Sequence, residues 1–160
     1  TYIIVMEAHL ALGQLEEASK YAGKAYRSLK GVNDLGKYGK LIAFYAVTNR
    51  RRALKMYRET CRYARLNVND WAKLHYLVGV QFLLEQLGEG AKRRRTASPA
   101  ELDYAWVRSE VERLVKAFDE RNQNEYVSRR IEGLRKSFEK LKRMSVPEAR
   151  RREEGGGTPS

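Results

Sequence analysis

The chain has two histidines and one cysteine, residue types that bind transition metals and take part in nucleophilic catalysis: His9, His75 and Cys61. The two histidines lie far apart, and neither belongs to a His-x-x-x-His pair, which would place two imidazoles on one helical face. The single cysteine continues an apolar stripe of its own helix, so we expect it in the core. We therefore expect no metal, no cofactor and no catalytic residue, and we predict a protein that is not an enzyme.

A second candidate for chemistry is the segment Leu35–Leu41, LGKYGKL, which combines glycines with lysines. Glycine-rich loops bind phosphates when their backbone amides follow a strand and open a helix. The spacing here differs from that of a phosphate-binding loop, and no predicted strand precedes it. The segment therefore does not predict a nucleotide site.

A row of basic residues is the clearest signal. Its members are Arg51, Lys55, Arg58, Arg62 and Arg65. The spacing of 4, 3, 4 and 3 places them on one face of a helix, over about 20 Å. Only Glu59 interrupts the positive sign, and like charges at this spacing repel each other by a few tenths of a kcal/mol. An acidic protein, a nucleic-acid backbone or an anionic membrane would offset that repulsion. The alternative is an ordinary exposed face of a charge-rich protein.

The net charge of +12 is unevenly distributed. Residues 1–36 have a net charge of zero, residues 37–95 carry +10 and residues 96–160 carry +2. A second basic cluster, in a predicted loop, adds to the middle region and consists of Lys92, Arg93, Arg94 and Arg95. Nucleic acid is one partner that such a patch suggests, with phosphates bound by Lys and Arg. Tyr57 and Tyr63 lie nearby, although aromatic residues at helical spacing more often belong to a core.

These residues need helices to position them. Thr1–Leu12 reads as one helix, Gly13-Gln14 as a turn, and the next helix extends to Leu29. Ala18, Ala22 and Ala25 share one face of that second helix, and small residues at this spacing let two helices approach closely.

The pattern recurs along the chain. A shift of 35 residues places Ala11 on Ala46, Ala18 on Ala53 and Arg27 on Arg62. A second helix pair is thus expected over Asp34–Leu66, with its turn at Thr48-Asn49. Gly13, Ala18 and Ala25 resemble the signature of a tetratricopeptide repeat, whose period is close to this shift. The resemblance covers residues 1–87, and the second pair departs from it where Thr48 replaces the glycine.

The resemblance implies a function. Such repeats bind peptides or helices in a groove lined by the first helix of each pair. The groove positions here are Ile3, Glu7, Leu10, Tyr38, Ile42, Tyr45, Lys73 and Leu77. Their apolar character suits an apolar helix or an extended segment. The alternative is that neighbouring helices of the chain simply bury them.

The rest of the chain predicts three further helices. Asn69-Asp70 caps a helix over Trp71–Leu87, and a loop follows over Gly88–Pro99. Ser98 with Glu101 forms a capping box for a helix that extends to about Arg121. The last helix carries a heptad-like stripe of Val127, Ile131, Leu134, Phe138 and Leu141. This stripe suits either an intramolecular hairpin or a docking surface. Val146-Pro147 is expected to end the helix.

The sequence therefore predicts an all-α protein of antiparallel helix pairs. Residues 1–95 are expected to form a short repeat array, 96–145 a helical hairpin packed on it, and 146–160 a disordered tail. We expect a protein-interaction or scaffold module with a basic face for an acidic partner. Nucleic-acid binding and a sensor segment of a larger regulator are the alternatives. A cytoplasmic location is expected, because no membrane span or signal peptide is visible, although the chain starts at Thr1 inside a helical pattern and targeting signals can precede it.

Overall fold

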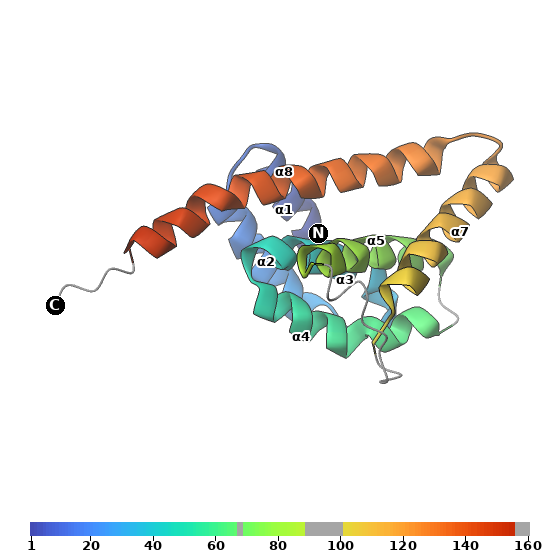
Figure 1. Ribbon diagram of the computed structural model, residues 1–160, viewed down its shortest axis with the longest axis horizontal. Coiled ribbons are helices and arrows are strands. Elements are labelled where there is room, and N and C mark those ends of the chain that lie inside the picture. The colour runs from blue at the N-terminus through green and yellow to red at the C-terminus, as the bar shows by residue number, and fades with distance from the viewer. Residues whose placement is uncertain (67–68, 89–100, 156–160) are drawn as a thin grey trace.

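The computed structural model describes residues 1–66, 69–88 and 101–155, with side chains as far as residue 145. Every regular element within these ranges is a helix, as predicted (Figure 1). The α-helices are α1 Tyr2–Ala11, α2 Leu15–Ser28, α3 Leu35–Thr48, α4 Arg50–Thr60, α5 Asp70–Gln86, α7 Tyr104–Asn122 and α8 Tyr126–Gly155. Two 3₁₀ helices, η1 Val32–Asp34 and η2 Cys61–Arg65, precede α3 and follow α4. None of the described helices is long and apolar enough to cross a membrane.

The helix boundaries in the first half of the chain follow the local sequence signals. Gly13 has a positive φ of 73°, which glycine adopts without steric cost, and it separates α1 from α2. Asn49 begins α4 by accepting a hydrogen bond from the Arg52 amide at 3.2 Å. Asn69 begins α5 in the same way, from the amides of Trp71 at 2.8 Å and Ala72 at 3.2 Å. The predicted turns and the cap of α5 are confirmed.

Two glycines allow α3 and α5 to come into backbone contact. A Cβ atom added to Gly39 would lie 2.5 Å from the carbonyl oxygen of His75 and 2.5 Å from the Cα of Tyr76. A Cβ added to Gly79 would overlap the carbonyl oxygen of Gly39. No side chain can occupy the crossing point, so the two helices make the most extensive helix–helix contact of the described chain.

The core is organised around α5. Its residues from Leu74 to Leu84 are buried, because α3, α7, α8 and η2 all contact this helix. A buried hydrogen bond of 2.9 Å joins the hydroxyls of Tyr76 and Thr60 and so connects α5 to α4. Ala18, Ala22 and Ala25 of α2 are also buried, as their spacing predicts, since α2 packs on α1.

The last helix lies across the molecule and its C-terminal part extends beyond the other helices (Figure 1). Four members of its apolar stripe are buried and Leu134 is partly buried. Phe138, for example, lies 5.1 Å from Phe82 of α5 between ring centroids. The stripe therefore packs inside this chain, which confirms the intramolecular alternative for these residues.

The turn between α7 and α8 has its own stabilising contacts. Gln123 adopts the left-handed conformation, with a φ of 55°. The Asp119 carboxylate, near the end of α7, accepts hydrogen bonds from the amides of Val127 at 2.9 Å and Ser128 at 3.2 Å. It also accepts one from the Ser128 hydroxyl, and these contacts lower the pKa of Asp119. A carboxylate at the N-terminus of α8 also complements the helix dipole.

The predicted start of the helix now called α7 is wrong by several residues. Ser98 lies outside the described residues, and the helix begins at Tyr104. The reason is a tertiary contact: the amide of Leu102 donates to the Tyr57 hydroxyl at 2.7 Å, and that hydroxyl donates to the Leu102 carbonyl at 3.3 Å. With both backbone groups bonded to a side chain of α4, Leu102 does not take part in the helical hydrogen-bond pattern.

The predicted end of α8 is also wrong, because the helix continues through Pro147 to Gly155. Proline inside a helix removes one amide donor and costs about 3 kcal/mol, but it does not forbid a helix. The residues that follow, Glu148 to Glu154, include alanine, arginine and glutamate, which have high helix propensity. The prediction of disorder for residues 146–160 remains a prediction.

The helix crossing gives a first testable prediction. Gly79→Ala should lower the free energy of unfolding by about 3 kcal/mol, because the added methyl group overlaps the Gly39 backbone. This value is near the upper end of the destabilisation that larger side chains cause in a packed core. Gly133→Ala is the matched control, since a Cβ there has open space around it in α8. The control should stabilise the protein by about 0.5–1 kcal/mol. Urea unfolding followed by circular dichroism measures both, and equal effects would refute the close crossing.

The Tyr57 contact gives a second prediction. Tyr57→Phe removes both hydrogen bonds to Leu102 and should cost about 1–3 kcal/mol, because two buried backbone groups lose their partner. Tyr126→Phe is the control at an exposed position and should change little.

The same residue should affect stability at high pH. Burial raises the pKa of Tyr57 to about 12, above its ordinary value of 10.0, so only the unfolded chain ionises this group between these values. Stability should fall as the pH rises from 10 to 12, and Tyr57→Phe should show a smaller fall. An unchanged slope in this variant would contradict the assignment.

Candidate interaction surfaces

The basic residues of α4 point outward because the opposite face of the helix is fixed in the core. Ala53, Met56, Tyr57 and Thr60 are buried at the spacing of 3, 1 and 3 that one helical face requires. Arg51, Lys55 and Arg58 therefore lie on the exposed side, as predicted.

The row does not continue as one α-helix. The chain tightens into η2 at Cys61, so Arg62 and Arg65 lie on a 3₁₀ turn, and the expectation of a single α-helical face is wrong in this detail. Residues three apart eclipse each other in a 3₁₀ helix. This geometry keeps Cys61 and Ala64 both buried and leaves Arg62 and Arg65 both exposed. The five cations still share an exposed surface, which we call the basic face.

Two carboxylates lie on the basic face. Glu59 is 3.8 Å from Lys55, and Glu101, from the segment before α7, is 3.6 Å from the Arg58 guanidinium. Arg65 donates to the main-chain carbonyl of Glu101 at 2.8 Å. Within the described chain, no carboxylate lies at ion-pair distance from Arg51 or Arg62. The five cations outnumber these two carboxylates, so the face keeps a net positive charge.

The arginines that flank the row have other contacts. Arg50 reaches the Gln86 carbonyl at the end of α5, at 3.5 Å, where a cation complements the helix dipole. Arg52 lies over the rings of Tyr26 and Tyr45, 5.5 and 5.2 Å from their centroids. The predicted extension of the patch through Lys92, Arg93, Arg94 and Arg95 lies outside the described residues.

The aromatic residues near the basic face are engaged by the protein itself. Tyr57 is buried and bonded to Leu102. Tyr63 is partly buried, and the Arg62 guanidinium lies 5.1 Å from its ring centroid. Neither ring is a free platform on which a nucleic-acid base can stack.

The predicted groove positions divide into two sets. Ile3, Ile42, Tyr45 and Leu77 are buried in the core, so they do not form an exposed row. Glu7, Leu10, Tyr38 and Lys73 are partly exposed. The physical reason is the mutual packing of the first helices: α3 contacts α1, α4 and α5, and so the first helices of the predicted pairs cover one another. For the four buried positions, the alternative of burial by neighbouring helices holds.

A small apolar cavity of about 290 Å³ remains where α8 passes α1 and α3. Its walls include Met6, Leu10, Phe44, Phe138 and Leu141. An ion pair of 2.8 Å between Glu7 and Lys40 lies at its edge. Two predicted groove positions, Glu7 and Leu10, thus contribute to a real concavity.

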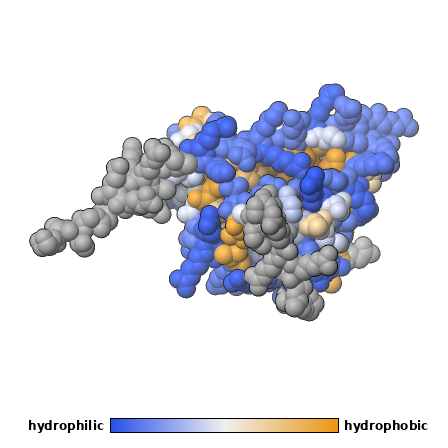
Figure 2. Space-filling view, in the orientation of Figure 1, coloured by the Kyte–Doolittle hydropathy of each residue, from blue (hydrophilic) through white to orange (hydrophobic). Residues whose placement is uncertain are grey.

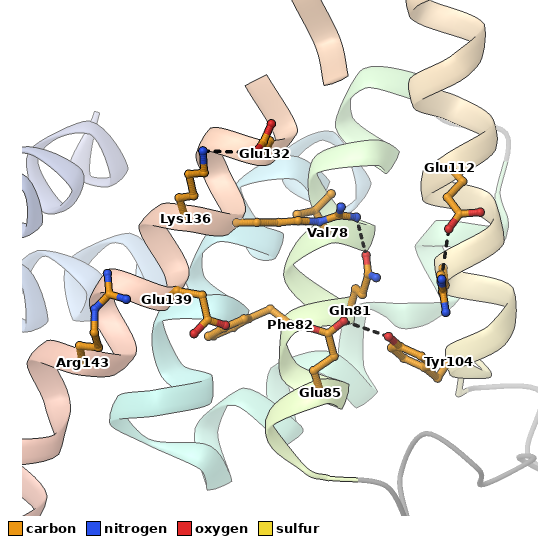
Figure 3. A pocket seen from close by; sticks show the side chains of 12 residues that line it. Val78, Gln81, Phe82, Glu85, Tyr104, Glu112, Glu132, Lys136, Glu139 and Arg143 are labelled. Carbon is orange, nitrogen blue, oxygen red and sulfur yellow. Dashed lines mark hydrogen bonds and ion pairs between the residues drawn. The ribbon is translucent and has the colours of Figure 1, made fainter. Parts of the chain in front are cut away.

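A larger cleft of about 630 Å³ opens between α5, α7 and α8 (Figure 3). Arg135 of α8 donates to the Gln81 side chain at 3.0 Å, and Tyr104 of α7 donates to Glu85 at 2.9 Å. Figure 2 shows apolar surface in the trough beneath α8, with hydrophilic surface along both rims.

The charges of this cleft are of mixed sign and largely paired. Arg108 and Glu112 are 3.2 Å apart within α7, and Lys136 and Glu132 are 3.2 Å apart within α8. The cleft therefore does not present a single-sign surface to a charged ligand.

The residues considered first for chemistry occupy structural positions. Cys61 is buried, and burial raises the pKa of its thiol, which disfavours the reactive thiolate. His75 is buried against Trp71, with its Nδ1 2.9 Å from the Trp71 carbonyl, and burial lowers its pKa. His9 lies on α1 beside Gln14. Among the described residues, no three potential ligands come together as a metal site.

Comparison with known proteins identifies no relative: no protein-family model, no curated protein and no solved structure matches the chain. Its function must therefore be inferred from the surfaces themselves.

Proposed function

We propose that this protein is a non-enzymatic helical interaction module that binds an acidic segment of another protein through the basic face. The observation that carries the proposal is the exposure of five cations on one surface, where Arg51 of α4 and Arg62 of η2 have no carboxylate partner among the described residues. An acidic partner would supply the missing charges and relieve the repulsion among the five.

A protein partner fits this face better than a nucleic acid. Glu59 and Glu101 lie among the cations, where they would repel a phosphate backbone, which is negative at every step, whereas an acidic protein segment can place neutral or basic residues opposite these two carboxylates. The burial of Tyr57 and the contact of Tyr63 with Arg62 also remove the stacking that single-stranded nucleic acids use.

The proposal includes the tetratricopeptide-like arrangement. It is supported by the contacts of α1 with α2 and of α3 with α4, two helix pairs whose small residues recur after 35 positions. In such an arrangement α8 occupies the groove side of the array, so the outer surface, including the basic face, is where a partner binds.

The test uses a labelled acidic peptide of about 20 residues, a duplex DNA and a single-stranded RNA, all followed by fluorescence anisotropy at about 0.05 and 0.15 M ionic strength. We expect the wild-type protein to bind the peptide. Reversal of three face cations, Arg51→Glu, Lys55→Glu and Arg62→Glu, should weaken that binding by about 10- to 100-fold, since each exposed pair contributes up to about 1 kcal/mol.

The control reverses the same number of charges elsewhere, as Lys116→Glu, Arg129→Glu and Lys142→Glu on α7 and α8. It should retain most of the peptide binding. Equal losses in both triple variants would indicate a net-charge effect and would refute a specific face. Tighter binding of DNA or RNA than of the peptide, with the same dependence on the face, would replace the proposal by nucleic-acid binding.

A further inference from the structure

Helix α1 is apolar on nearly all sides. Its sequence, YIIVMEAHLA, contains one carboxylate and one histidine among ten residues. A helix of this character is normally enclosed by other elements. In the described chain it is covered on one side only, where Ile3 and Met6 are buried against the core.

The uncovered side of α1 forms an uncharged ridge. Ile4 and Leu12 have exposed fractions of 68% and 71%, the highest among the exposed large hydrophobic residues of the described chain. Ala8 and Ala11 lie between them and are also exposed. These four residues fall on one helical face about 12 Å long, which we call the α1 face. Exposed apolar surface gains free energy when another apolar surface covers it, which makes the α1 face a candidate for such a contact.

The α1 face is complementary to itself. Ala8 lies midway between Ile4 and Leu12, four residues from each. If two copies pair about a two-fold axis that passes through Ala8, Ile4 of each copy contacts Leu12 of the other copy. The alanine at the axis lets the two helices approach closely, and the larger side chains pack on either side of it.

The charge distribution also favours a second copy. Residues 1–36 have a net charge of zero, whereas the rest of the chain carries +12. Two copies therefore meet through the α1 face with less repulsion than through the basic region. Two polar groups of α1 that flank the face are already engaged: Glu7 pairs with Lys40, and His9 contacts Gln14.

We propose that the α1 face is a self-association surface, through which two copies of this chain form a two-fold dimer. The contact of one short helix per copy lies below the usual area of a stable interface, about 1,200 Å² in total. The dimer is therefore weak, with a dissociation constant on the order of 100 μM.

Sedimentation velocity over about 5–500 μM protein tests the proposal. We expect a concentration-dependent shift from monomer to dimer, and Ala8→Arg should weaken it at least tenfold because two cations then meet at the axis. Ala117→Arg, the same change at an exposed alanine of α7, is the matched control and should leave the shift unchanged.

Two further readouts separate this surface from the basic face. Raising the ionic strength should not weaken the dimer, because salt screens the repulsion between two cationic chains whose contact is uncharged. The same change should weaken the binding of an acidic peptide to the basic face, because salt screens that attraction. In an Ala8→Cys variant, mild oxidation should yield a disulfide-linked dimer, while Ala117→Cys and the wild type, whose Cys61 is buried, should not.

A wild-type protein that stays monomeric up to about 500 μM would overturn the proposal, and the α1 face would then have another occupant. A dimer that Ala8→Arg leaves intact would also overturn it. Neither result bears on the basic face, because α1 contributes no residue to that surface.

Discussion

The contact between Gly39 and Gly79 is the constraint on which the other helices depend. Because no side chain separates α3 from α5, their backbones meet, and α5 becomes the buried centre of the molecule. α7 and α8 then pack on α5, while α4 packs on α3. The direction in which α4 presents its cations is therefore set by two glycines that do not belong to the basic face.

Local chemistry explains which parts of the fold the sequence predicts. The glycine turn at Gly13, the turn at Thr48-Asn49 and the asparagine cap at Asn69 depend on a few neighbouring residues, and all three occur as expected. The glycine crossing was not predicted. Gly39 lies in the segment considered for phosphate binding, and its importance depends on Gly79, which lies forty residues later in sequence.

In the candidate site too, the sequence predicts features that depend on neighbouring residues and misses features that depend on tertiary contacts. Helical periodicity correctly placed Arg51, Lys55 and Arg58 outside. It missed the 3₁₀ turn, because Cys61 and Ala64, apolar residues three apart, fit an α-helical face equally well. Glu101 joins the face only through tertiary packing. Whether Ile42 and Leu77 formed a groove or a core depended on how closely α3 and α5 pack, which the two glycines of the crossing determine.

The cations of the basic face destabilise α4, the helix that carries three of them. Like charges along α4 oppose the helical state, and the long Lys55–Glu59 and Arg58–Glu101 contacts offset this only in part. What holds α4 in place is the burial of Ala53, Met56 and Tyr57 on its other side. The core thus compensates for a surface charge that contributes nothing to folding, which fits the binding role proposed for the basic face.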